Sequence, residues 1–133
     1  MMAKAIDYFN NALNIEPKSI EARYALGMFC QENEEYNKAI EAYTTILQID
    51  PDYREAHYNL GYIHLVYLKV YDVAAKHFTD AINCDSNFAE AYYNRGYCFE
   101  LLGDINNAKT DYEKALKIKT NYSKAIEGLN RIQ

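Results

Sequence analysis

The sequence predicts an all-helical protein made of repeated antiparallel helix pairs, and three observations lead to this fold class. Several residue types recur at intervals of 34 or 35 residues along the chain. Within each interval, apolar residues follow one another at spacings of three and four, which is the pattern of an amphipathic helix. Glycine and proline number only 5 and 2 among 133 residues, which favours long helices with few sharp turns.

The interval is shared by five separate series of residues. Repetition with a period of 20–50 residues is the sequence signature of a solenoid, in which each repeat is one supersecondary unit. Here the unit is a helical hairpin, because each period contains two helical stretches separated by a short break. The five series are Pro17 and Pro51; Gly27, Gly61 and Gly96; Ala5, Ala39, Ala74 and Ala108; Phe9, Tyr43, Phe78 and Tyr112; and Ala12, Ile46, Ala81 and Ala115.

The three glycines lie at the same phase of the first helical stretch, where glycine costs roughly 1 kcal/mol relative to alanine. The small residues Ala39, Ala74 and Ala108 lie at a matching phase of the second stretch. We therefore expect a close Gly/Ala contact inside each hairpin. A larger residue at Gly61 should overpack this contact at a cost of about 1–3 kcal/mol.

The clearest copy of the motif runs from Arg54 to Phe88 and contains His57, Leu60, Gly61, His64, Ala74, Phe78 and Ala81. This pattern resembles the tetratricopeptide repeat (TPR) family, and the resemblance covers essentially the whole chain. It implies a right-handed superhelix, an α-solenoid of antiparallel hairpins, with the first helices on the concave face and the second helices on the convex face. The sequence departs from the motif where Arg95 replaces leucine and where Ser86 and Thr120 replace proline.

The repeats divide the chain into one domain, residues 1–133, with about three full repeats and a partial repeat at each end. We interpret residues 1–19 as a half repeat, and residues 20–53, 54–88 and 89–122 as full repeats. Residues 123–133 form a capping helix. The middle repeat has one extra residue near Leu68-Lys69-Val70-Tyr71. Part of the apolar stripe of the first segment, Ile6, Phe9 and Leu13, is expected to lack a partner helix.

The resemblance also implies a peptide-binding groove, lined by fixed positions of each first helix. Tyrosine offers a large contact area at low entropy cost, and asparagine carries both a donor and an acceptor that suit a peptide backbone of any sequence. An extended segment of roughly 6–10 residues would fit, because such a peptide advances ~3.3 Å per residue. The predicted binding residues are Glu21, Tyr24, Met28, Glu55, Tyr58, Asn59, Tyr62, Glu90, Tyr93, Asn94, Tyr97, Lys124 and Arg131.

Two other interpretations of these positions remain. The same residue types are common background in the family, where they suit a helix start and a solvated face. Some members instead clamp the C-terminal carboxylate of chaperones with five polar and basic residues. In one window of this sequence only one of those five positions matches, and in the next window two match; the first window holds Tyr24, Met28, Asn59, Glu90 and Asn94. Chaperone-tail binding is therefore not favoured.

The main alternative function is a structural or assembly module that self-associates through the open N-terminal half repeat. Such a module should show a concentration-dependent mass that is lost when Phe9 or Leu13 becomes charged. A peptide binder should stay monomeric and lose its partner when Tyr58 and Asn59 change.

Other function classes find little support in the sequence. The few serines lie at inter-repeat turns, and there is no glycine-rich phosphate loop, so we expect no enzyme and no cofactor. His57, His64 and the three cysteines fall at packed phases without metal-ligand spacing, so no metal site is predicted. A net charge of −5 disfavours nucleic-acid binding. No membrane span or signal peptide is predicted; a cytoplasmic location is the default expectation, for a chain that may belong to a longer protein.

Overall fold

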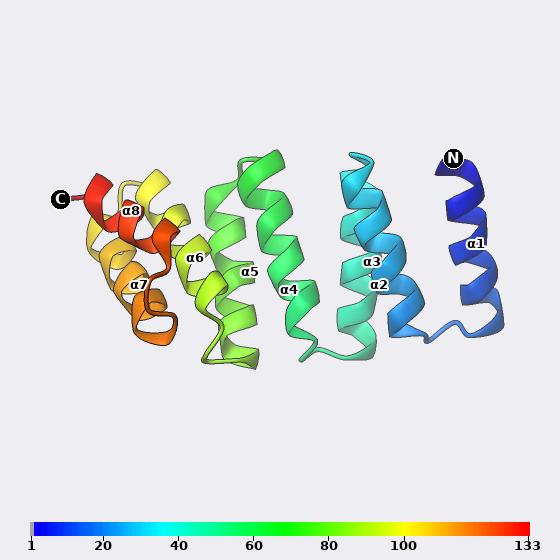
Figure 1. Ribbon diagram of the computed structural model, residues 1–133. Coiled ribbons are helices and arrows are strands. Elements are labelled where there is room, and N and C mark those ends of the chain that lie inside the picture. The colour runs from blue at the N-terminus through cyan, green and yellow to red at the C-terminus, as the bar shows by residue number, and fades with distance from the viewer. Residues whose placement is uncertain (1) are drawn as a thin grey trace.

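The computed structural model describes residues 2–133 as a row of packed helices (Figure 1). No strand occurs within that range, so the predicted all-helical solenoid is confirmed. Met1, the first residue of the predicted half repeat, lies outside the described residues. The elements are α1 (Met2–Ile15), α2 (Ile20–Glu32), α3 (Tyr36–Ile49), α4 (Arg54–Tyr62), the π-helical η1 (Ile63–Tyr67), α5 (Tyr71–Cys84), α6 (Ala89–Leu101), α7 (Ile105–Ile118) and α8 (Ser123–Arg131).

Three hairpins form the body of the molecule: α2 with α3, α4 and η1 with α5, and α6 with α7. In Figure 1 the turns inside the hairpins lie along the upper edge, and the connections from α1 to α2, α3 to α4 and α5 to α6 lie along the lower edge. Helices α1 and α8 stand at the two ends of the row. No helix within residues 2–133 is both long enough and apolar enough to cross a membrane.

Polar side chains shape the connections between hairpins, as expected for turn residues. The Ser19 hydroxyl accepts a hydrogen bond from the Ala22 backbone N–H at 3.2 Å and so caps α2. In the next two connections, the Asp50 and Asp85 carboxylates accept hydrogen bonds from backbone N–H groups two residues further on, at 3.1 and 3.0 Å.

The tight contact inside each hairpin joins a glycine to an aromatic ring. A Cβ atom added at Gly61 would lie 2.7 Å from the Cε1 atom of Phe78, and equivalent additions at Gly27 and Gly96 would approach the rings of Tyr43 and Tyr112. A larger residue at Gly61 would therefore collide first with the Phe78 ring, whereas the sequence analysis expected a contact with alanine. The alanines of the second helices are fully buried, but the rings lie nearest to the glycines.

The ring at this position is matched to a residue near the end of the first helix. Where the ring is a tyrosine, its hydroxyl donates to a polar side chain: Tyr43 to Gln31 at 2.9 Å, and Tyr112 to Glu100 at 2.6 Å. In the middle hairpin the ring is Phe78, and the residue equivalent to Gln31 and Glu100 is the buried Leu65. A buried tyrosine hydroxyl needs a hydrogen-bond acceptor, whereas a phenyl ring has no polar group and packs against an apolar side chain.

The extra residue of the middle repeat is accommodated by the π-helical segment η1. Wider turns of this kind arise where one residue is inserted into a helix. The Leu68 backbone N–H donates to the Ile63 carbonyl oxygen at 3.0 Å, and the Val70 N–H donates to the His64 carbonyl oxygen at 2.9 Å. Lys69 then takes a left-handed conformation, with a φ of 58°, that reverses the chain.

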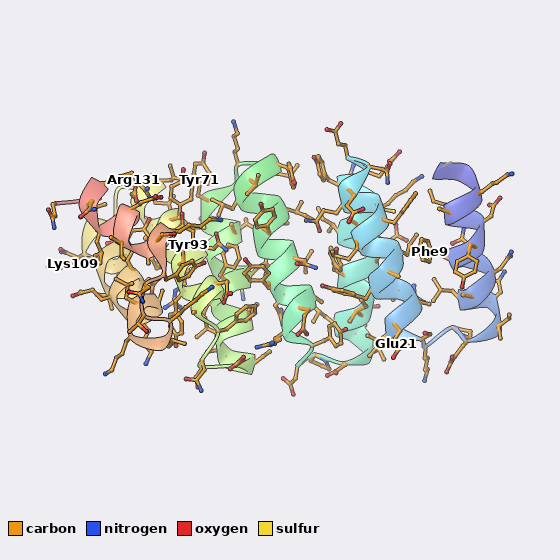
Figure 2. The ribbon with its side chains drawn as sticks, viewed as in Figure 1. Phe9, Glu21, Tyr71, Tyr93, Lys109 and Arg131 are labelled. Atoms are coloured by element: carbon orange, nitrogen blue, oxygen red, sulfur yellow. The ribbon has the colours of Figure 1, made fainter. Side chains whose placement is uncertain are left out.

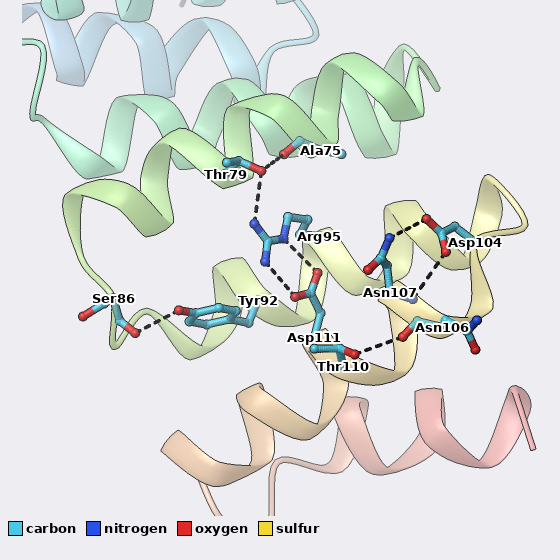
Figure 3. Close-up of polar contacts among 10 residues, drawn as sticks. All are labelled: Ala75, Thr79, Ser86, Tyr92, Arg95, Asp104, Asn106, Asn107, Thr110 and Asp111. Atoms are coloured by element: carbon cyan, nitrogen blue, oxygen red, sulfur yellow. Dashed lines mark hydrogen bonds and ion pairs between the residues drawn. The ribbon is translucent and has the colours of Figure 1, made fainter.

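Arg95, which stands where the family has leucine, is partly exposed and forms an ion pair with the buried Asp111 (Figure 3). Its guanidinium donates two hydrogen bonds of 2.8 Å to this carboxylate and a third, of 3.2 Å, to the Thr79 hydroxyl. The hydrogen bonds to Asp111 raise the pKa of Arg95, and the three contacts together join α5, α6 and α7. The departure from the family motif is therefore compensated within the chain.

The histidines and cysteines of the sequence have structural contacts. The ring nitrogens of His57 and His64 lie 2.8 Å from the carbonyl oxygens of Pro51 and Leu60, respectively. Burial raises the pKa of the Cys98 thiol to about 12. Within residues 2–133, no group of histidine, cysteine, aspartate and glutamate side chains is arranged to hold a metal ion.

Candidate functional site

Three tyrosines of the first helices, Tyr24, Tyr58 and Tyr93, occupy equivalent places, each between two other aromatic rings. The ring centroids of Tyr58 and Phe78 are 5.5 Å apart, and those of Tyr58 and Phe88 are 4.9 Å apart. Tyr24 and Tyr93 make the same pair of contacts in their own repeats, at 5.5–5.9 Å. The three partly buried rings therefore pack against the core, and this packing fixes the position of each hydroxyl.

One ring of each cluster was missed by the sequence analysis. The rings that lie between one hairpin and the next are Tyr53, Phe88 and Tyr122. Their positions in the sequence differ by 35 and 34 residues, which is the interval of the other series. This sixth series was the available signal for their common role.

Asparagines link the tyrosines of neighbouring repeats. The Asn59 side-chain amide donates to the Tyr24 hydroxyl oxygen at 3.0 Å, and that of Asn94 donates to the Tyr58 hydroxyl oxygen at 2.8 Å. We call these four residues the tyrosine–asparagine ladder. Because each tyrosine oxygen accepts from an amide, its own proton is left to donate elsewhere, and each amide keeps its carbonyl oxygen as an acceptor.

The Tyr58 hydroxyl of the ladder lies in partly buried surroundings that favour its neutral form. Burial raises the pKa of Tyr58 to about 12, and the nearby negative charge of Glu90 acts in the same direction. Asn94 is itself buried, whereas Asn59 is half-buried. Asn94 is therefore held mainly by its bond to Tyr58, and the more accessible part of the ladder lies at Asn59.

A second row of predicted residues continues from the ladder toward the ends of the same helices. Tyr62 stacks on Tyr58 with a centroid distance of 6.5 Å, and Tyr97 stacks on Tyr93 at 6.4 Å. In the first hairpin this place belongs to Met28, whose sulfur lies 3.5 Å from the Asn59 amide nitrogen. The second row is thus apolar and aromatic, and it directly adjoins the ladder.

The predicted acidic residues differ in how far their charge is balanced. Glu55 accepts a hydrogen bond from Arg54 at 2.9 Å, and Glu90 lies 3.6 Å from the Lys119 ammonium group. Glu21 is exposed and has no ion pair among the described residues. The row of three glutamates expected from the sequence therefore presents one unbalanced carboxylate.

At the basic end of the predicted site, one of the two basic side chains already forms an ion pair within the chain. Arg131 donates to both Glu100 carboxylate oxygens, at 3.0 and 3.1 Å, and its guanidinium lies 5.4 Å from the ring centre of Tyr97. Burial raises the pKa of Glu100, but the hydrogen bonds from Arg131 and Tyr112 outweigh this effect and lower it. Lys124 is exposed and has no ion pair within residues 2–133. Figure 2 shows Arg131 at the end of the row, near Tyr93.

Two family models match the sequence. A model described as tetratricopeptide repeat matches residues 89–122, and a model described as TPR repeat matches residues 28–67. Together these matches cover more than half of the chain. None of the curated proteins matches it.

Several solved structures share the fold. The crystal structure of MamA aligns with a TM-score of 0.90 and 25% identity, over 98% of this chain and 76% of that chain. The first TPR of Spaghetti (RPAP3), bound to the HSP90 peptide SRMEEVD, aligns with a TM-score of 0.80 and 25% identity, over 85% and 89% of the two chains. The second TPR domain of human RPAP3, in complex with the HSP70 peptide SGPTIEEVD, aligns with a TM-score of 0.77 and 27% identity, over 86% and 98%.

Proposed function

This chain belongs to the tetratricopeptide repeat family, and from that premise we propose that it is a non-catalytic scaffold that holds a short extended segment of a partner protein. The segment lies along the first helices, α2, α4, α6 and α8. Two structural neighbours whose peptides are known hold segments of seven and nine residues. The proposed length of roughly 6–10 residues, from the rise of an extended chain, is similar.

The observation that carries this proposal is the tyrosine–asparagine ladder. It presents the hydroxyl protons of Tyr24 and Tyr58 and the amide oxygen of the half-buried Asn59, which no other side chain within residues 2–133 uses, while the buried Asn94 supports Tyr58. A peptide backbone offers one acceptor and one donor per residue, so it can pair with such a row whatever its side chains are. The ring clusters hold the hydroxyls in place before the peptide binds, which lowers the entropy cost of binding.

The chemistry of the face favours a neutral or basic partner segment. Glu21 is an unbalanced carboxylate at one end of the row, and Arg131 at the other end is neutralised by Glu100. The peptides held by the two RPAP3 domains end in acidic residues. We propose that this chain takes a different class of segment, because Lys124 alone of the two predicted cations has no ion pair within residues 2–133, which is less than a cluster that could clamp an acidic tail.

A matched pair of variants tests this function. Met28 and Ile49 each expose 36% of their surface, but Met28 adjoins the ladder and Ile49 lies at the end of α3. Pull-downs from source-cell extract would use the native chain, Met28→Lys and Ile49→Lys, after circular dichroism has shown equal helicity. We expect a partner that the native chain and Ile49→Lys retain and that Met28→Lys loses. Equal retention by all three would contradict the proposal.

A second candidate function, self-assembly through α1, is favoured by one observation. Tyr8 and Ile15 of this helix expose 71% and 87% of their surfaces. Phe9, by contrast, packs against Phe29 with a centroid distance of 5.9 Å, so the stripe expected to be open is partly covered. Analytical ultracentrifugation of the native chain and Tyr8→Lys would test this candidate. A mass that is independent of concentration would contradict it.

A further inference from the structure

Large apolar side chains gather at the edge formed by the hairpin turns, and one of them, Tyr67, meets Tyr62 of the second row with a centroid distance of 6.1 Å. They belong to the turns inside the second and third hairpins and to the ends of the helices that those turns join. Each exposes 37–48% of its surface. We call this set the turn-edge patch: Val66, Tyr67, Leu68, Val70, Val73, Leu101, Leu102 and Ile105.

The two turns are neighbours in the fold. Helix α5 packs against α6, and its first residues follow one turn while the last residues of α6 precede the other. In Figure 1 both turns lie along the upper edge, in the green and yellow parts of the row. The side chains of the two turns therefore form one surface that spans successive hairpins.

The second-hairpin part of the patch is held in a fixed conformation. Tyr67 stacks on Tyr36 of the preceding hairpin, with a centroid distance of 4.4 Å and an angle of 17° between the ring planes. The backbone hydrogen bonds of Leu68 and Val70 close the turn on both sides of Lys69. A surface ordered in this way loses little entropy when a partner binds.

The rim of the patch is acidic. Around the three hairpin turns there are five carboxylates and two ammonium groups without an ion pair within residues 2–133. No ion pair within that range neutralises these charges, and two of the carboxylates, Asp72 and Asp104, accept hydrogen bonds from the helix starts beside them. Asp72, Asp104 and Lys69 lie at the two turns of the patch, and Glu32, Glu34, Glu35 and Lys38 lie at the neighbouring turn of the first hairpin, which the stacked rings of Tyr36 and Tyr67 join to the patch.

We propose that the turn-edge patch docks an amphipathic helix of a partner protein. The apolar stripe of this helix covers the patch, and basic residues beside the stripe meet the acidic rim. A helix of roughly 10–14 residues is about 15–20 Å long, enough to cross two hairpins whose helices pack about 8–10 Å apart. The proposal does not depend on the peptide-binding function of the ladder.

Size and charge favour this occupant over two others. The eight side chains expose on the order of 500 Å², within the usual range for the largest apolar patch of a monomer. A stable interface between two copies needs about 800 Å² from each partner, which exceeds the patch. Anionic lipid headgroups would be repelled by the acidic rim, so a membrane surface is also disfavoured.

The test begins with a photo-reactive benzoylphenylalanine in place of Leu102, and in a control chain in place of the exposed Gln48. Both chains are irradiated in source-cell extract, and the cross-linked segment is sequenced by mass spectrometry. We expect a segment with apolar residues at helical spacing and lysine or arginine beside them, cross-linked at position 102 only. Cross-links confined to lipid or to a second copy, or none beyond those of the control, would overturn the proposal.

A synthetic peptide of that segment then separates the patch from the ladder. We expect it to gain helicity on binding, to bind more weakly as salt rises, and to lose at least about ten-fold in affinity with Leu68→Asp/Leu102→Asp or with Glu34→Lys/Asp72→Lys. Met28→Lys should leave its affinity unchanged. Loss of binding with Met28→Lys but not with the patch or rim variants would assign the peptide to the ladder and overturn the proposal.

Discussion

The two ends of the solenoid are held by different interactions. At the C-terminal end, the nine-residue helix α8 is fastened by Arg131, which binds Glu100, and by Gly128, whose backbone approaches the Tyr112 ring closely. At the N-terminal end, the 14-residue helix α1 rests on α2 through Phe9, and a cavity of about 270 Å³ lies between α1, α2 and α3. Helix length alone therefore does not decide how firmly an end is held.

The largest expected effect concerns the ion pair of the C-terminal half. Asp111→Ala leaves Arg95, whose side chain is 21% exposed, without its counter-ion, so we expect a loss of about 3 kcal/mol in the free energy of unfolding, measured by urea denaturation. The double variant Arg95→Leu/Asp111→Leu replaces the pair by apolar groups and should recover most of the loss. A double variant as unstable as Asp111→Ala would contradict this account of the pair.

Packing variants at the two ends should differ in how far their effects spread. A Cβ atom at Gly128 would lie 2.6 Å from the Cζ atom of Tyr112, so Gly128→Val should cost about 1–3 kcal/mol and loosen α7 together with α8. Phe9→Ala removes a half-buried ring and should increase backbone amide exchange in α1 only. Hydrogen exchange of the backbone amides shows which helices open more often in each variant. If Phe9→Ala also accelerated exchange beyond α1, the proposed difference between the two ends would be contradicted.

Acidification should release the C-terminal end selectively. The folded state lowers the pKa of Glu100, so its stabilising contribution is present above the unfolded-state value of 4.5 and is lost as the pH falls below it. We expect about 1 kcal/mol or less, because the pair is partly exposed. Amide exchange in α8 should accelerate between about pH 5 and pH 3, and Glu100→Gln should remove this dependence. Equal acceleration in the variant would refute the role of Glu100.

The smallest effect concerns the turns inside the first and third hairpins. Glu34 and Gly103 both take left-handed conformations, with φ of 63° and 82°, but only glycine adopts this region without steric cost. Glu34→Gly should therefore stabilise the chain by about 0.5 kcal/mol, and Gly103→Ala should destabilise it by about 1 kcal/mol. Thermal unfolding measures both changes, and a shift of the same sign in the two variants would rule out this explanation.

The period in the sequence was sufficient to predict the fold, because each repeat carries its own helix pattern and its own glycine. The resemblance to the family, not the period, suggested the ladder tyrosines and asparagines as groove residues, and their role in binding stays a prediction. The period did not reveal that Asn59 and Asn94 bond to tyrosines of the preceding repeat, because that contact depends on how hairpins stack. Similarly, Arg95 was recognised as an exception, but its partner Asp111 lies on a different helix, where no local pattern marks it.

The side-chain amide signals of Asn59 and Asn94, followed by nuclear magnetic resonance, test the central claim most directly. A peptide from the partner that the native chain retains and Met28→Lys loses would be titrated into the native chain. The account predicts that the Asn59 signal shifts most as its amide binds the peptide backbone, that the buried Asn94 signal shifts less, through its bond to Tyr58, and that the signals of the turn-edge patch stay in place. Shifts confined to the turn edge or to α1, with both amide signals unchanged, would contradict it.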